Sequence, residues 1–144
     1  KVIVIPTRSA PQGISAMLNL NPDLSAEELA PIFTEAAERV HTALITYAAR
    51  DSEFDGHNIR AGEYLGLLDG KLLGSYTELP ALLRDLQEAF ASLAPEYISI
   101  YYGQDASAED AENVSKVLSD GFPEAEVSLI KGGQPVYSYM ISAE

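Results

Sequence analysis

Residues 2–13 of the chain read VIVIPTRSAPQG, a run of four β-branched residues followed by a polar loop. Such a run is typical of a strand buried on both faces, as in the middle of a parallel sheet. Pro6 ends this predicted strand. Thr7, Arg8 and Ser9 then follow its carboxyl end, where open α/β sheets place their binding crevices. The alternative is a structural loop, in which the hydroxyl groups bond their own backbone and Arg8 forms a surface ion pair.

The composition predicts one domain that spans residues 1–144. The chain has 144 residues, of which 47% are hydrophobic. This length is enough to bury a hydrophobic core that needs no disulfide or structural metal for stability. It has no cysteine and two histidines without metal-like spacing, so we expect neither disulfides nor a catalytic zinc site. It has no signal peptide and no long apolar run, which predicts a cytoplasmic protein without a membrane span. Because it begins at Lys1 and not at Met, we expect a fragment of a longer chain.

The charge of the chain limits its partners. The formal net charge is −13 at pH 7, which repels nucleic acid phosphates and anionic lipid headgroups. A basic protein surface is the large partner that this charge favours. Solubility alone is an alternative explanation of the acidity.

The remaining sequence alternates helix and strand patterns. Ser25 with Glu28, Thr77, and Ser107 with Asp110 are predicted helix caps, and Asp69-Gly70 is a hairpin signal. We expect a weak helical turn at 14–20, a helix at 26–40, a short hairpin or loop at 50–62, and strands at 42–49, 63–68, 71–76, 97–102, 126–131 and 136–141. The last two strands are predicted to form an antiparallel hairpin. The fold class is therefore α/β, with a mixed, largely parallel sheet, about three main helices and a β-hairpin insertion.

Polar side chains follow several of these strands. If the strands run parallel, their carboxyl ends meet at one edge of the sheet, and the side chains there form a rim. The predicted rim for a partner or an anion consists of Thr7, Arg8, Ser9, Gln12, Arg50, Asp51, Gln104, Gln134 and Tyr137. A guanidinium group offers a planar fork of donors to a carboxylate or a phosphate. The alternative is a set of rim salt bridges, Arg8 with Asp51 or Arg50 with Asp105. No nucleophile motif, phosphate loop or acid–base pair is present, so we expect no catalytic residue and no metal site.

Five short motifs occur in a distinctive order along nearly the whole chain. They are VIVIPTRSAPQG at 2–13, YAARD at 47–51, DG at 55–56, DGK at 69–71 and GGQPVYSY at 132–139. With this set the chain resembles the C-terminal domain of the large subunit of bacterial fatty acid kinase, in the dihydroxyacetone-kinase-like family. The segment from Ile98 onward is also similar to the second lobe of the DegV fold.

The resemblance implies a role within a larger enzyme. In that family an N-terminal domain binds ATP and magnesium, and the C-terminal domain helps to dock a DegV-like protein that presents a fatty acid for conversion to an acyl phosphate. The resemblance therefore implies no cofactor in this domain, and no catalysis by this domain alone. Its expected partners are the DegV-like carrier and other domains of the same kinase.

Two other functions remain open at this point. One is a domain that binds a fatty acid or a small anion at the same rim. The other is a scaffold or homodimer that pairs through an exposed sheet edge, for which the C-terminal strand is the candidate.

Overall fold

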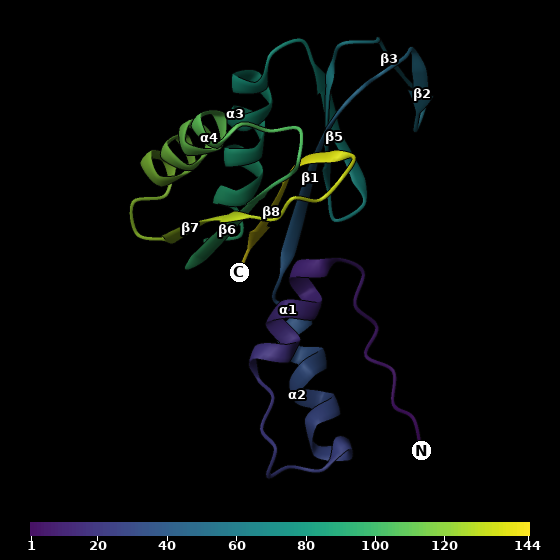
Figure 1. Ribbon diagram of the computed structural model, residues 1–144, viewed down its shortest axis with the longest axis vertical. Coiled ribbons are helices and arrows are strands. Elements are labelled where there is room, and N and C mark those ends of the chain that lie inside the picture. The colour runs from purple at the N-terminus through teal and green to yellow at the C-terminus, as the bar shows by residue number, and fades with distance from the viewer. The chain divides into compact units, whose positions relative to one another are not determined.

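The computed structural model describes all 144 residues and forms two compact units, Lys1–Thr42 and Ala43–Glu144. Figure 1 labels the helices and strands of both. The first unit contains a pair of helices, and the second contains most of a sheet covered by two further helices.

Two helices, α1 (Ala10–Leu18) and α2 (Ala26–Glu38), pack against each other in the first unit. Helix α2 begins with the predicted capping box. The Ser25 hydroxyl accepts a hydrogen bond from the Glu28 backbone N–H, and the Glu28 carboxylate accepts one from the Ser25 backbone N–H. This exchange satisfies backbone donors that a helix start leaves without partners. Pro31 lies inside α2 without ending it.

The buried first strand predicted at residues 2–5 is wrong. Residues 1–8 have no regular secondary structure, and Val2 and Val4 are 88% and 80% exposed. The six-stranded sheet takes all its strands from residues 41–143. A β-branched run is stable as a strand only where a neighbouring strand pairs with it, and here none does.

The sheet has six strands in the order β5-β4-β1-β8-β6-β7. In chain order they are β1 (His41–Tyr47), β4 (Tyr64–Leu68), β5 (Lys71–Tyr76), β6 (Tyr97–Tyr102), β7 (Glu126–Lys131) and β8 (Tyr137–Ala143). A separate short hairpin joins β2 (Ser52–Phe54) to β3 (His57–Ile59), as predicted for residues 50–62.

The mixed α/β class is confirmed, whereas the predicted predominance of parallel strands is wrong. β6 and β7 are parallel, but β1 and β4, β4 and β5, and β6 and β8 are antiparallel. The Thr46 hydroxyl near the end of β1 donates to the Val136 carbonyl just before β8, at 2.8 Å. The end of β1 therefore lies beside the beginning of β8, and these strands are antiparallel too.

The predicted hairpin of the last two strands is wrong because β6 lies between β7 and β8. The backbone N–H groups of Gly132 and Gly133 both donate to the Tyr102 carbonyl, at 3.1 and 3.0 Å, where the chain passes the end of β6. β8 then pairs on the other side of β6, with β1 as its second neighbour. The C-terminal strand thus has no free edge for a dimer, and the sheet edges are β5 and β7.

The hairpin of β4 and β5 turns at Asp69-Gly70, as predicted. Both residues have positive φ, 50° and 79°, which is the geometry of the tight turn that matches the twist of two antiparallel strands. The turn fixes the register that places Leu68 opposite Lys71.

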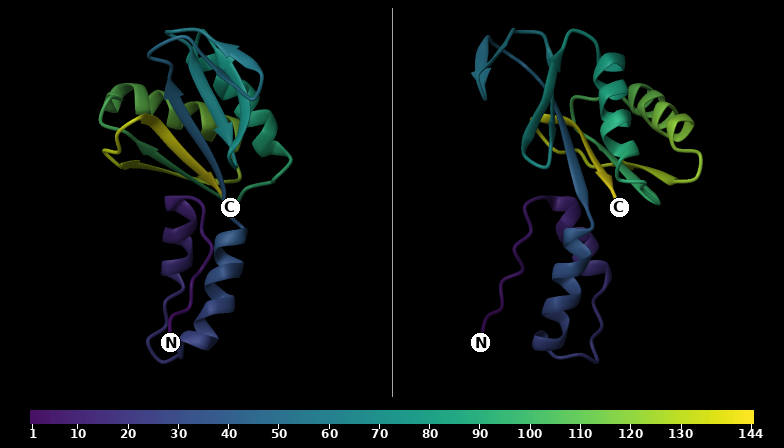
Figure 2. Two further views of the ribbon diagram at one scale, coloured as in Figure 1. Left: turned by 90° about the vertical axis from the view of Figure 1, so that its right-hand side faces the viewer. Right: turned by 180° about the vertical axis from the view of Figure 1, so that it is seen from behind.

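Two helices cover one face of the sheet, α3 (Leu79–Ala91) and α4 (Ala108–Gly121), as Figure 2 shows. Ser107 caps α4 as predicted, with its hydroxyl accepting from the Asp110 backbone N–H at 3.0 Å. The predicted cap Thr77 is wrong: α3 starts one residue later, after Glu78, whose side chain makes no capping hydrogen bond.

The core lies between these helices and the sheet. Its fully buried side chains come from the inner faces of α3 and α4 and from alternate positions of the strands: Leu82, Leu86, Phe90, Val114, Leu118, Ile45, Ile98, Ile100 and Ile141. Phe90 of α3 contacts Phe122 just after α4, with ring centroids 6.4 Å apart. This packing holds both helices over the sheet, and the starts of the two helices border a large pocket of the second unit.

Candidate functional site

The predicted rim residues of the first unit hold the start of α1. The Ser9 hydroxyl caps α1 and shares a 2.7 Å hydrogen bond with the Thr42 hydroxyl. The Gln12 side chain accepts from the Arg8 backbone N–H at 2.7 Å and donates to the Val40 carbonyl at 3.3 Å. These contacts give Ser9 and Gln12 a structural role. Thr7 and the Arg8 side chain are exposed, and Arg8 forms no ion pair.

Arg50 and Asp51 begin the loop that follows β1. The Asp51 carboxylate accepts a hydrogen bond from the Ala61 backbone N–H at 2.7 Å, which closes the base of the β2–β3 hairpin. Arg50 is exposed and makes no ion pair, so the predicted pair of Arg50 with Asp105 does not form.

Gln104, Gln134 and Tyr137 come together where β6 ends and β8 begins. The Gln134 side-chain amide donates to the carbonyls of Tyr101 and Tyr137, at 2.9 and 3.3 Å. The Gln104 backbone N–H donates to the Gln134 carbonyl at 3.1 Å. We call this the β6–β8 junction, residues 103–105 and 134–138. The Gln134 side chain and the Gln104 backbone thus hold the two loops together.

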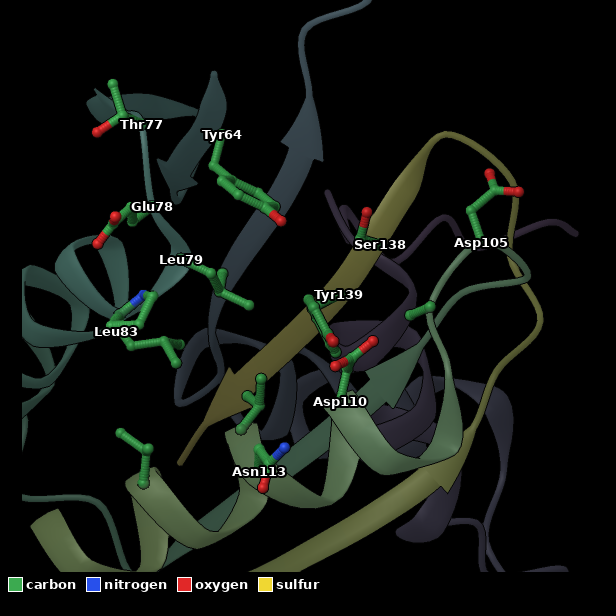
Figure 3. Close-up of a pocket in the computed structure, with 14 residues that line it drawn as sticks. Tyr64, Thr77, Glu78, Leu79, Leu83, Asp105, Asp110, Asn113, Ser138 and Tyr139 are labelled. Carbon is green, nitrogen blue, oxygen red and sulfur yellow. The ribbon is translucent and has the colours of Figure 1, made fainter. Parts of the chain in front are cut away.

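A pocket of about 610 Å³ opens beside the β6–β8 junction, between the starts of α3 and α4 and the strands β4 and β8. Figure 3 shows the side chains that surround it. Its polar lining consists of Glu78, Asp105, Asp110, Asn113, Thr77, Ser138, Tyr64 and Tyr139, and its apolar lining of Leu79, Pro80, Leu83, Ala106, Val114 and Val117. Three of these side chains are carboxylates, and no lysine, arginine or histidine is among them. We call it the acidic pocket.

Tyr139 is a buried residue whose hydroxyl lines the acidic pocket. The residue is 3% exposed, and its hydroxyl makes no hydrogen bond to another protein group. Figure 3 shows the end of this side chain and the Asp110 carboxylate pointing toward one another. Burial raises the pKa of Tyr139 to about 12, and the negative charge of Asp110 adds to the effect. Tyr139 therefore stays protonated, with both its O–H donor and its oxygen lone pairs available to a ligand.

Tyr139 makes the stability of the protein sensitive to high pH. Because the folded pKa of about 12 lies above the ordinary value of 10, the folded state binds the proton more tightly than the unfolded chain between these values. The stabilisation is complete below pH 10 and is lost as pH rises toward 12. We expect the free energy of unfolding to fall by about 1 kcal/mol over this interval on account of Tyr139, less than the full shift implies, because water reaches the pocket.

Urea unfolding at several pH values checks this expectation against Tyr139→Phe, which should lose less stability over the same interval. The Tyr76 pKa is also raised, by burial and by its hydrogen bond to Asp85, but Tyr76 is present in both proteins and cancels in the comparison. Equal pH slopes for the two proteins would contradict the assignment to Tyr139.

Sequence reasoning missed the acidic pocket. Asp110 was recognised only as part of a helix cap, a role that it does have. Tyr139 lies within the predicted strand at 136–141, and nothing in the sequence singles out Glu78. One clue is present in the sequence, because Asp105 and Ser138 adjoin the predicted rim residues Gln104 and Tyr137. The contribution of the starts of α3 and α4 to the pocket depends on the strand order.

No three His, Cys, Asp or Glu side chains are grouped closely enough to hold a metal ion. No helix has both the length and the apolar character needed to cross a membrane.

Sequence comparison identifies relatives over the whole chain. A family model for the FakA-like C-terminal domain of fatty acid kinase matches residues 1–144. Protein YloV of Bacillus subtilis is 37% identical over 144 residues, which are 100% of this chain and 26% of that protein. An uncharacterized protein of Staphylococcus aureus is 31% identical with the same coverage. The chain thus spans about a quarter of the length of these curated relatives.

Comparison with solved structures identifies the fold. A DegV family protein from Corynebacterium glutamicum matches with a TM-score of 0.67 at 15% identity, over 92% of this chain and 58% of that one. The Streptococcus pneumoniae fatty acid kinase B3 protein, solved with linoleic acid, matches with a TM-score of 0.60 at 12% identity, over 85% and 50%. These likenesses confirm the expected DegV-like fold. Because the family model matches every residue from 1 to 144, the chain belongs to the family of FakA-like C-terminal domains of fatty acid kinase.

Proposed function

We propose that this chain is the partner-docking domain of a cytoplasmic fatty acid kinase, and that it helps to bind a DegV-like carrier loaded with a fatty acid. The observation that carries this proposal is the family match over all 144 residues. The kinase reaction, its ATP and magnesium, and the acyl phosphate product belong to other parts of the enzyme. This domain supplies no catalytic residue and no cofactor site.

The lining of the acidic pocket supports docking over direct binding of the lipid. The fold is shared with a protein solved with linoleic acid and with another described as fatty acid binding. The alternative is therefore that this chain also holds a fatty acid or a small anion. A fatty acid carboxylate in the acidic pocket would lie among Glu78, Asp105 and Asp110 with no cationic side chain to balance it. Like charges at such short range repel, which disfavours an anion there.

Arg8 and Arg50 are the two exposed arginines that we expect to contact the carrier. Arg8 and Arg50 have no carboxylate partner within the protein, so each guanidinium group is available to an acidic side chain of another protein. Arg50 follows β1, whose end adjoins the start of β8 and hence the β6–β8 junction.

Titration calorimetry of this chain against a fatty-acid-loaded DegV-like protein from the same organism tests the proposal, at low and at moderate salt. We expect binding that weakens with salt, and a roughly tenfold weaker Kd for Arg50→Glu. Arg8→Glu tests the other arginine in the same way.

Lys71→Glu is the matched control, because it makes the same change of charge at the opposite end of the sheet. Lys71 pairs with Leu68, which lies opposite Ala43 near the start of β1, away from Arg50. Equal weakening by Arg50→Glu and Lys71→Glu would contradict this placement of the interface. Absence of any binding by the unchanged domain would contradict the docking function.

A further inference from the structure

We propose that the acidic pocket is the receptor for an arginine side chain on the surface of the docked protein partner. The inference rests on the proposed docking function and specifies the chemistry of the contact. It depends on the acidic lining of the pocket, on the unpartnered Tyr139 hydroxyl and on the apolar walls.

The free acceptors of the pocket suit a guanidinium group. One oxygen of Asp110 accepts from the Ser107 hydroxyl at 2.6 Å, and its other oxygen has no partner in the protein. The carboxylates of Glu78 and Asp105 make no hydrogen bond or ion pair. The Tyr139 hydroxyl oxygen adds a neutral acceptor, on a residue that is itself 3% exposed. Arginine has five N–H donors in a planar fork and no acceptor, so it can use several of these oxygens at once.

The walls of the pocket suit the rest of an arginine side chain. Leu79 and Leu83 of α3 line the pocket together with Val114 and Val117 of α4. Methylene groups pack well against such walls while the charged end reaches polar atoms. Tyr64 also lines the pocket, and its ring meets Tyr47 edge to face at a centroid distance of 5.1 Å. This contact holds a ring on which a guanidinium group can stack.

The net negative charge of the chain favours a protein as the source of the arginine. The chain carries a net charge of −13, which speeds encounters with a basic surface. Arginine is enriched among the residues that dominate protein interfaces, where it fills desolvated pockets on the partner. The pocket is larger than one side chain needs, so it also has room for the backbone that carries the arginine.

Calorimetry with the fatty-acid-loaded carrier tests the proposal on three versions of the chain. Asp110→Asn keeps the shape of the side chain and an oxygen for the Ser107 hydroxyl, but removes the charge from the pocket. We expect its affinity for the carrier to fall about tenfold, as for the loss of a charge-assisted hydrogen bond. Glu109→Gln is the matched control, because Glu109 lies in the same first turn of α4 but does not line the pocket. It removes the same charge from the same helix start, and we expect less than about a twofold change.

A second measurement keeps this inference separate from the identity of the carrier. N-acetyl-arginine amide is titrated into the isotope-labelled chain, and the backbone amide shifts of residues 105–114 and 138–140 are followed by NMR. We expect saturable shifts in the unchanged chain and in Glu109→Gln, and much weaker ones in Asp110→Asn. N-acetyl-lysine amide should bind more weakly than the arginine probe, because it lacks the planar fork.

The outcomes separate the two proposals. If the carrier does not bind but the arginine probe does, the pocket inference stands and the proposed carrier is wrong. If the carrier binds all three versions equally, docking stands and the pocket inference is overturned. Failure of the arginine probe to shift the pocket residues, or equal shifts in Asp110→Asn, also overturns it.

Discussion

Replacing Phe90 with alanine is expected to lower the free energy of unfolding of residues 43–144 by about 3–5 kcal/mol. Phe90 is 0% exposed and is the largest of the fully buried side chains. Its ring lies in the cluster formed by α3, α4 and the sheet, and contacts Phe122. Truncation removes this apolar contact and leaves a cavity, because the neighbouring helices and strands can close in only partly.

Urea unfolding followed by far-ultraviolet circular dichroism measures this loss. Glu88→Ala is the matched control, because residue 88 lies on α3 but is exposed. A surface change of this kind is expected to alter stability by less than about 0.5 kcal/mol. A loss below about 1 kcal/mol for Phe90→Ala would mean that the two helices do not share one core with the sheet.

Gly103→Ala is expected to destabilise the same unit by about 3 kcal/mol, at the upper end of the usual effect of overpacking. A Cβ atom at residue 103 would lie 2.7 Å from the Gln134 carbonyl oxygen and still closer to that of Tyr137. Both oxygens belong to the backbone, so a side-chain rotation cannot relieve the clash. The Gly103 backbone N–H also donates to the Ser138 carbonyl at 2.8 Å, which fixes its position.

The matched control is Gly13→Ala, since a Cβ atom at residue 13 would meet no atom within 4 Å. Gly13 lies inside α1, where alanine is favoured over glycine by about 1 kcal/mol. We therefore expect a slightly stabilised protein. Amide hydrogen exchange at residues 103 and 104 gives a local readout for Gly103→Ala, because loosening of the β6–β8 junction should speed exchange there. Unchanged stability and exchange would contradict the tight approach of these loops.

Sequence patterns that span only a few residues predict the local structure of helix starts and turns well. The capping box of Ser25 and Glu28, the cap of Ser107 with Asp110, and the turn at Asp69-Gly70 each depend on neighbouring backbone groups. Their local hydrogen bonds and dihedral preferences determine the geometry. These predictions are confirmed, as is the mixed α/β class predicted from the alternation of helix and strand patterns.

Features that depend on distant parts of the chain could not be predicted in this way. The run at residues 2–5 has strand propensity, but whether a strand pairs with it is decided elsewhere in the fold. The Gly-rich turn at 132–135 reads as a hairpin in sequence, yet β6 separates the two strands that it joins. The acidic pocket is lined by Glu78, Asp110 and Tyr139, which come from three separate parts of the chain. The pocket can therefore be predicted only once the strand order is known. The single-domain organisation and the binding role of the rim residues stay predictions.

The central place of β8 has a consequence for how the protein is made. Within the sheet, β5, β4 and β1 form one group and β7 and β6 form another, and β8 alone joins them. β8 is also the last of the six strands to leave the ribosome. Until it arrives, β1 and β6 each keep an unpaired edge, and such edges attract strands of other chains. We therefore expect the nascent protein to emerge as two sheet fragments with unpaired edges, which stay open to aggregation until residues 137–143 are free to close the sheet.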